Sequence, residues 1–366
     1  MAGSVRFMPP QPGEVPEIDR VPGAPHPREM LSLVGQSAAE ASFLELYNAH
    51  KLHHAFLLVG PEGVGKATFA YRAARFLLSK AEREGGDALF GVGAPETLDV
   101  APESRTAHLV ANDAHPDLAV LRRRYDPKTK KFRSEISVED TRNTLALFEK
   151  TSAFGGWRVI IVDAADDLNT ASANALLKTL EEPPARAVFL LVTHQPQKLL
   201  PTIRSRCRTL AFSPLAPADL RALVPAISGV AAMDEAAIVR AAGSVRRALR
   251  LGNPGLRAFL ATIDDVLGQL PKRRHAEIDR IAEASRTGPE GEQAFADFLE
   301  AVESWLDRAV RHHASAGDVL RASMLAEFWA RMSENAARLD AFNLDRRAFV
   351  ITLVDELATL VSGGQR

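Results

Sequence analysis

Cysteine is almost absent from this sequence, since its 366 residues include one, Cys207. One cysteine can form neither an intramolecular disulfide nor a thiolate zinc cage. No apolar run reaches the length of a membrane-spanning helix, and the N-terminus lacks the basic and apolar regions of a signal peptide. We therefore expect a cytoplasmic protein in a reducing compartment, with no zinc, no metal site and no membrane association.

Net charge is also nearly absent, because 45 Lys and Arg residues face 46 Asp and Glu residues. Such a chain is not a basic nucleic-acid binder as a whole, so any such role requires a local patch. A dense basic stretch, "RRRYDPKTKKFR", covers residues 122–133, and its Asp126-Pro127 pair predicts a turn and hence a hairpin. Two interpretations stay open for it, a solvated surface loop and a contact with DNA phosphates or a partner.

Short continuous apolar runs alternate with helical patterns between about residues 30 and 213. Continuous runs suit strands that are buried on both faces, as in a parallel sheet covered by helices. The alternation predicts an α/β domain with a parallel sheet. The expected strands are 55–60, 117–121, 158–163, 187–193 and 208–212, and the expected helices between them are 68–84, 137–152 and 171–182.

The rest of the chain divides by composition. Residues 1–27 are rich in proline, which interrupts helices and leaves little to bury, so we interpret them as a tail along the surface. Residues 28–213 form the expected α/β domain. After Phe212 the strand signals largely stop, which predicts a small helical domain over 214–253 and a larger all-helical domain over 254–366.

The stretch "GPEGVGK" at residues 60–66 follows a predicted strand and precedes a predicted helix, as the phosphate-loop pattern G-x-x-x-x-G-K requires. Gly60, Gly63 and Gly65 would let backbone N–H groups wrap phosphate oxygens. Lys66 would reach the β- and γ-phosphates, and the helix N-terminus would add its dipole. The alternative interpretation is a glycine-rich turn with a surface lysine.

Two positions depart from the pattern of an ATPase. The residue after the loop lysine normally supplies a hydroxyl for Mg²⁺, but here it is Ala67, and Thr68 lies about 100° further around the helix. Asp163 ends a predicted strand where an acid would help to hold Mg²⁺, but Ala164 follows it instead of a glutamate. Asp166 and Asp167 fit a capped turn better than a substitute base. Together these departures favour a chain that binds phosphates at most weakly, as ATP or ADP, and does not hydrolyse ATP.

Four motifs occur in order: "LHHAFLLVGPEGVGKAT" (52–68), "NALLKTLEEPP" (174–184), "LVTHQPQKLLPTIRSRC" (191–207) and "GSVRRAL" (243–249). Over about residues 30–250 they resemble bacterial clamp-loader subunits of the AAA+ class, which belong to DNA polymerase III. The combination of "TLEEPP" and "SRC" is more specific than the phosphate loop. The resemblance implies an AAA+ domain, then a helical lid, then a helical collar that joins five subunits in a ring.

The resemblance also implies roles for individual residues. Arg206 of "SRC" would be an arginine finger that reaches the ATP of a neighbouring subunit. Arg246 of "GSVR" and Thr193 would be the two sensor positions of this chain's own site. Without that context, Arg206 would be interpreted as a surface arginine paired with a nearby carboxylate. Glu181 and Glu182 could bridge to a neighbouring subunit or pair within the domain.

The implied partners are the gamma or tau ATPase subunits and the delta subunit, and through them the sliding clamp and primer-template DNA. Gamma and tau subunits keep the hydroxyl and the Asp-Glu pair that this chain lacks at Ala67 and Ala164, so a non-hydrolysing member of the polymerase holoenzyme is favoured. Relatives with a four-cysteine zinc module carry it where this chain has the cysteine-free region 81–116. The alternatives are a gamma- or tau-like subunit that hydrolyses ATP and a non-replicative AAA+ scaffold.

Overall fold

The structure is a computed structural model of the 366-residue chain. It describes residues 16–21, 23–80, 94–129, 131–148, 152–229, 233–286, 288–342 and 345–363. The chain forms two compact units, Met1–Gly252 and Asn253–Arg366. In the cysteine-free region 81–116, residues 81–93 lie outside the described part, and helix α4 covers Arg105–Ala111.

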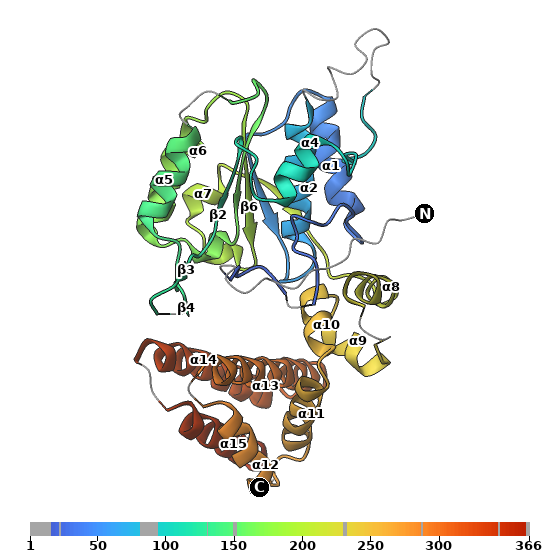
Figure 1. Ribbon diagram of the computed structural model, residues 1–366. Helices are drawn as coiled ribbons and strands as arrows, with labels where there is room; N and C mark the ends of the chain where they lie inside the picture. Colours follow the sequence, from blue (N-terminus) through green and yellow to red (C-terminus); the bar gives the residue numbers. More distant parts are fainter. Residues whose placement is uncertain are drawn as a thin grey trace. The chain divides into compact units, whose positions relative to one another are not determined.

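A five-stranded sheet forms the centre of the first unit, with the strand order β2-β5-β6-β1-β7. All of its neighbouring strands are parallel, so the predicted parallel sheet is confirmed. Figure 1 shows helices on both faces, with α1, α2 and α4 on one and α5, α6 and α7 on the other. The strands are β1 (Ala55–Val59), β2 (Leu118–Leu121), β5 (Arg158–Val162), β6 (Ala187–Thr193) and β7 (Arg208–Ala211); the helices are α1 (Ser37–Asn48), α2 (Lys66–Leu78), α5 (Val138–Phe148), α6 (Thr170–Glu181) and α7 (Pro201–Arg204).

The central strands are apolar along their whole length because both of their faces are covered. Every residue of β6 is buried, as are four of the five residues in both β1 and β5. On one face, Phe43 of α1 packs against Phe56 of β1 and Phe69 of α2, with ring centroids 5.2 and 5.7 Å apart. This packing explains why the predicted strands read as continuous apolar runs.

Parallel pairing gives the sheet two different edges. The carboxyl ends of β1, β5 and β6 meet at one edge, where β1 leads into the phosphate loop and β5 leads into Asp163. Arg208 at the start of β7 is paired with Phe56 of β1, so residues that precede β7 lie at the opposite edge. The register thus separates the loop at residues 60–66 from the motif that contains Arg206.

The basic segment 122–133 contains the hairpin that its sequence predicts. Strands β3 (Tyr125–Asp126) and β4 (Lys131–Phe132) are antiparallel. Tyr125 lies opposite Phe132, and their rings meet edge to face with centroids 5.4 Å apart. The turn between these strands is therefore held at its base by this pair of aromatic rings.

Helices follow the sheet domain in the rest of the described chain. The first unit ends with α8 (Pro217–Ser228), α9 (Glu235–Ala241) and α10 (Val245–Leu251), and short 3-10 turns cover Ala165–Asp167 and Pro196–Lys198. The second unit consists of α11 (Pro254–Gly268), α12 (His275–Ala284), α13 (Pro289–Ser315), α14 (Val319–Phe342) and α15 (Arg346–Ser362).

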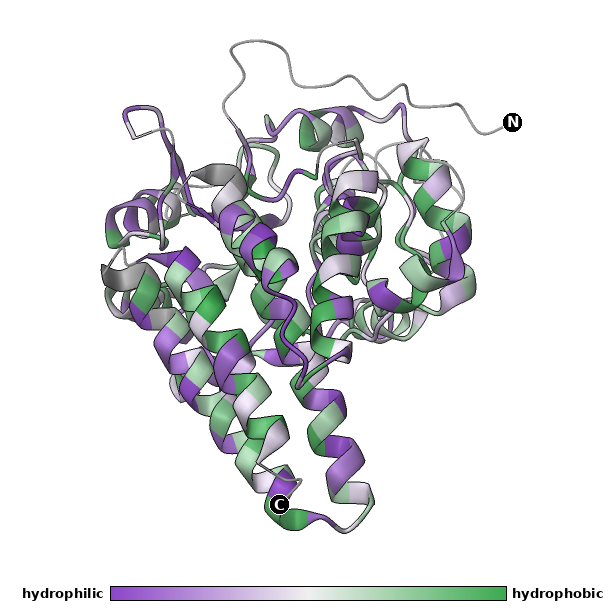
Figure 2. Ribbon diagram, turned by 90° about the horizontal axis from the view of Figure 1, so that it is seen from below, coloured by the Kyte–Doolittle hydropathy of each residue, from purple (hydrophilic) through white to green (hydrophobic). Residues whose placement is uncertain are grey.

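The helices of the second unit are amphipathic. Figure 2 shows hydrophobic and hydrophilic residues alternating along them, and the buried set includes Phe298, Val302, Leu306, Val350 and Leu357. None of the helices within the described ranges is long and apolar enough to cross a membrane. These helices therefore gain their stability by packing against one another.

The aromatic packing under the phosphate loop provides a test of the core. Phe43→Ala removes a fully buried ring, so we expect the free energy of unfolding to fall by about 3–5 kcal/mol. Val239→Ala, at a side chain that is 68% exposed, should change it by no more than about 0.5 kcal/mol. Urea unfolding followed by circular dichroism measures both, and equal effects would contradict this assignment of the core.

Candidate functional site

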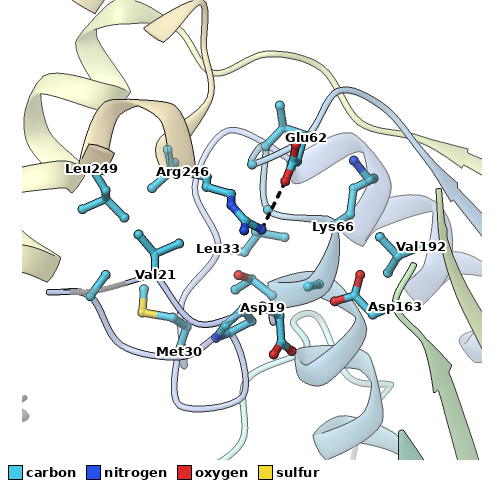
Figure 3. A pocket seen from close by; sticks show the side chains of 18 of the residues that line it. Asp19, Val21, Met30, Leu33, Glu62, Lys66, Asp163, Val192, Arg246 and Leu249 are labelled. Carbon is cyan, nitrogen blue, oxygen red and sulfur yellow. Dashed lines mark ion pairs between the residues drawn. The ribbon is translucent and has the colours of Figure 1, made fainter. Parts of the chain in front are cut away.

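A cavity of about 340 Å³ lies at the carboxyl edge of the sheet. The phosphate loop lines it together with the ends of β5 and β6, helix α10, and the N-terminal segment, which we define as residues 16–34. Figure 3 shows Lys66 and Asp163 on one side of this cavity and Val21, Met30 and Leu249 on the other. The site thus combines a charged part beside the loop with an apolar part built by the N-terminal segment and α10.

Glycine is required in the phosphate loop by close contacts as well as by backbone conformation. Gly63 and Gly65 have φ angles of +76° and +100°, which residues other than glycine rarely adopt. A Cβ on Gly63 would lie 2.2 Å from Oγ of Ser244, and one on Gly65 would lie 2.8 Å from Cδ1 of Leu33. The two glycines therefore let the loop approach α10 and the N-terminal segment.

Lys66 begins α2, and its amino group is held by the loop itself. Nζ donates to the carbonyl oxygens of Gly60 and Pro61, at 2.6 and 2.5 Å. Burial lowers the pKa of Lys66 to about 8, although the nearby carboxylates, Asp163 first, act in the opposite direction. Gly60 itself leaves no room for a side chain, since a Cβ there would lie 2.4 Å from the carbonyl oxygen of Phe212.

Asp163 lies at the end of β5 and lines the cavity. Burial, and then the charge of Asp19, raises the pKa of Asp163 to about 7, while Lys66 and Arg246 oppose the rise. A divalent cation at this place would compete with that proton for the carboxylate.

The fit to a magnesium nucleotide is therefore partial. The loop glycines and Lys66 fit a phosphate group, and Thr68 also lines the cavity. Methyl groups of Ala67 and Ala164 line it where the metal hydroxyl and the base would stand. In the part of the chain that the structure describes, no group of three or more His, Cys, Asp or Glu residues could hold a metal ion.

The carboxylates that follow Ala164 have structural partners. Asp166 accepts hydrogen bonds from Thr193 Oγ1, at 2.5 Å, and from the backbone N–H of His194, at 2.6 Å. Asp167 pairs with Arg123, with Nε and Oδ2 2.9 Å apart. Asp166 thus ties the turn after β5 to the end of β6, and Thr193 faces this carboxylate.

Arg246 connects α10 to both sides of the cavity. Its Nη1 lies 3.1 Å from Oε1 of Glu62 in the phosphate loop, the ion pair drawn in Figure 3, and its Nη2 donates to the carbonyl of Ile18 at 3.4 Å. Next to it, the backbone N–H of Val245 donates to the carbonyl of Gly63 at 2.8 Å. Helix α10 therefore begins directly on the phosphate loop.

The N-terminal segment is fixed over the cavity by a group of buried charges, although its proline content predicts a surface tail up to residue 27. Asp19 lies 3.0 Å from Nε2 of the fully buried His26 and 3.2 Å from Nη1 of Arg122. Arg122 also pairs with Glu17 at 2.8 Å. Burial alone would raise the pKa of Asp19, but the hydrogen bond with His26 and the charges of His26 and Arg122 hold it well below its usual range.

Two buried arginines of α2 hold the backbone of the same segment. Arg75 donates through Nη1 to the carbonyl of Arg28 at 2.7 Å and through Nη2 to that of Met30. Arg72 donates to the carbonyl of Leu31 and pairs with a carboxylate of α1. Sequence reasoning missed these residues. The available signal was that "TFAYRAARFLL" places both arginines within a helix that is otherwise apolar.

Arg206 lies at the other edge of the sheet, two residues before β7. Its Nη2 is 2.8 Å from Oε1 of Glu181, and its Nη1 donates to the carbonyl of Thr202 at 3.0 Å. The cavity lining within the described ranges does not include Arg206, and β7 separates the two places by about 13 Å for its four residues. Glu181 thus pairs within the domain, and Arg206 lies away from the Lys66 of its own chain.

Cys207 follows Arg206 and packs against the core of the same face. Burial raises the pKa of its thiol to about 12, so the reactive thiolate is scarce at neutral pH. This agrees with a packing role.

The raised pKa of Asp163 predicts a pH effect on stability. Its folded-state pKa of about 7 exceeds the ordinary 3.8, so the folded state binds the proton more tightly and loses stability as pH rises between these values. Asp163→Asn has no such proton, and we expect its stability relative to the natural chain to increase by about 2 kcal/mol from pH 5 to pH 8. Urea unfolding at both pH values measures this, and parallel curves would contradict it.

The charges under the N-terminal segment make a second prediction. Arg122→Ala removes the cation that two part-buried carboxylates share, so we expect a loss of about 2–4 kcal/mol of unfolding free energy. The matched control is Arg124→Ala in the same basic segment. That side chain is 60% exposed and should contribute less than about 1 kcal/mol. Limited proteolysis should cut the Arg122→Ala protein faster within residues 16–34, and equal protection of both variants would argue against this anchoring.

Comparison with known proteins gives a consistent set of relatives. The family described as "DNA polymerase III, delta subunit" matches residues 35–216. The chain is 33% identical to DNA polymerase III subunit delta' of Pseudomonas aeruginosa, over 61% of this chain and 63% of that protein. It is 33% identical to subunit delta' of Escherichia coli over 46% of this chain and 45% of that protein. Subunit tau of Salmonella typhimurium is 34% identical over 50% of this chain and 25% of that protein.

The chain therefore spans less than two thirds of the length of these relatives. Among solved structures, a gamma subunit-related protein of Thermotoga maritima aligns over 87% of this chain and 99% of that chain, with 18% identity and a TM-score of 0.37. The family match over residues 35–216 includes the phosphate loop, Asp163 and Arg206. Over residues 35–216, the matches support a delta prime-like clamp-loader subunit of DNA polymerase III.

Proposed function

We propose that this chain is a delta prime subunit of a clamp loader, which does not hydrolyse ATP itself and supplies Arg206 to the ATP site of a neighbouring subunit. The observation that carries the proposal is the position of Arg206 at the sheet edge opposite the phosphate loop. An arginine in that place cannot serve the loop of its own chain, but it is available to another subunit because its side chain is 36% exposed.

The chemistry of arginine suits this role. A guanidinium is planar, always charged and able to donate to several oxygens, which matches the charge that spreads over a transferring phosphoryl group. An arginine supplied in trans typically accelerates this reaction by about 10³–10⁵-fold. Arg206 thus acts on an ATP molecule that another subunit binds.

The chain's own cavity supports the other half of the proposal. Ala67 and Ala164 replace the metal-binding hydroxyl and the base, and burial keeps the Asp163 carboxyl protonated to near neutral pH. Phosphates of ATP or ADP could still be held by the loop glycines and Lys66, whereas the groups that position a metal ion and a water molecule are incomplete.

The domain organisation follows from the same proposal. Residues 28–213 are the AAA+ domain, residues 214–253 the lid and residues 254–366 the collar, which joins this subunit to the ring. The proposed partners are gamma or tau ATPase subunits and a delta subunit in a five-membered ring. Through them the chain acts in the cytoplasm on a sliding clamp and primer-template DNA.

ATP turnover by the isolated chain separates this proposal from a gamma- or tau-like ATPase. We expect no Mg²⁺-dependent release of phosphate above that of a Lys66→Ala control, because the hydroxyl and the base are absent. Robust hydrolysis that Lys66→Ala abolishes would instead establish an ATPase subunit.

Reconstitution with gamma-type and delta subunits tests the trans role. We expect Arg206→Ala to lower turnover at the one ATP site that it serves by about 10³-fold, while size-exclusion chromatography shows an intact assembly. The matched control is Arg204→Ala, at an exposed arginine two residues earlier, which should leave turnover unchanged. To isolate the site, the loop lysines of the other ATPase subunits are replaced. Unchanged turnover in the Arg206→Ala assembly would remove the finger role.

A further inference from the structure

The carboxylate of Glu181 fixes the plane in which Arg206 presents its guanidinium. Nη2 of Arg206 lies 2.8 Å from Oε1 of Glu181, and Nη1 donates to the carbonyl of Thr202 at 3.0 Å. The ion pair with Glu181 and the hydrogen bond to Thr202 are made by different nitrogens, so together they restrict how the planar group can turn. A guanidinium has five N–H donors, and the hydrogen bond to Thr202 uses one of them, so donors remain for another acceptor.

Both ends of this ion pair are attached to rigid structure. Glu181 is the last residue of α6 and follows Leu180, which is buried in the core beneath the helix. Arg206 follows α7, whose Ile203 is buried in the same core, and the two helices are in contact. Because the backbones on both sides are fixed, the pair loses less conformational entropy than an ordinary surface pair.

On these contacts, and resting on the proposed trans role of Arg206, we propose that Glu181 is a positioning residue for that arginine. Its carboxylate holds the guanidinium ready for the phosphoryl group of the neighbouring subunit, so that this ordering is complete before the subunits engage. Glu181 itself touches neither ATP nor the reacting atoms.

The two glutamates of "TLEEPP" therefore have different roles. Glu181 faces Arg206, whereas Glu182 is the C-cap of α6 and is exposed. The two residues have the same charge and lie side by side in sequence, so a long-range effect of negative charge would be nearly equal for both. Only a contact effect distinguishes them, which makes Glu182 the matched control.

The size of the expected effect follows from the exposure of the pair. The side chains of Arg206 and Glu181 are 36% and 50% exposed, and exposed ion pairs change an equilibrium by about two- to fivefold. We therefore expect Glu181→Ala to lower kcat at the site served by Arg206 by about two- to fivefold. The KM for ATP should be unchanged, because the neighbouring subunit binds that ATP.

The experiment is a double-mutant cycle in the reconstituted assembly, with the natural chain, Glu181→Ala, Arg206→Ala and the double variant, and with Glu182→Ala as control. The expected result is a loss of kcat for Glu181→Ala that disappears in the Arg206→Ala background, with Glu182→Ala at the natural rate. A loss that persists in that background would identify a structural role and overturn the proposal.

Two further outcomes also count against it. A natural or increased kcat for Glu181→Ala, while Arg206→Ala is strongly impaired, would leave the trans role standing and remove the positioning role. If Arg206→Ala itself turns over ATP at the natural rate, the trans role fails and the positioning role fails with it. Thermal unfolding of each variant shows that the chain is folded when these rates are compared.

Discussion

Parallel pairing of strands that are buried on both faces is the constraint on which the rest of the structure depends. It sends the carboxyl ends of β1, β5 and β6 to one edge, where the loop at residues 60–66, Asp163 and Thr193 come together. It sends the amino-terminal ends of β6 and β7 to the other edge, where Glu181 and Arg206 meet. Both sites thus belong to one sheet, and the length of β7 keeps Arg206 away from the cavity of its own chain.

The cavity at the carboxyl ends of the strands depends on pairing between charged groups inside the domain. Burying an arginine or a carboxylate alone is costly, and the charged groups that hold the N-terminal segment have partners of opposite charge or backbone acceptors. Arg75 binds carbonyls of the N-terminal segment, and Asp19 is shared by His26 and Arg122. These bonds order a proline-rich segment that has little helical tendency and turn it into one wall of the cavity.

The sequence predicted the five strands and the hairpin well, because continuous apolar runs and a turn before proline depend on local pattern. It also predicted a local alternative for Glu181, which pairs within the domain. It could not reveal the wall formed by residues 16–34, since the pairing of Asp19 with Arg122 joins positions about a hundred residues apart. The raised pKa of Asp163 escaped it for the same reason, because burial and the approach of Asp19 are properties of the folded chain.

One hydrogen bond, from the N–H of Val245 to the carbonyl of Gly63, couples the geometry of two elements that are far apart in sequence. Gly63 has no Cβ, and Ser244 and Arg246 occupy the space beside it. The first turn of helix α10 is therefore packed against the loop and hydrogen-bonded to it. The phosphate loop is thereby linked, through α10, to α8 and α9, with which α10 is in contact.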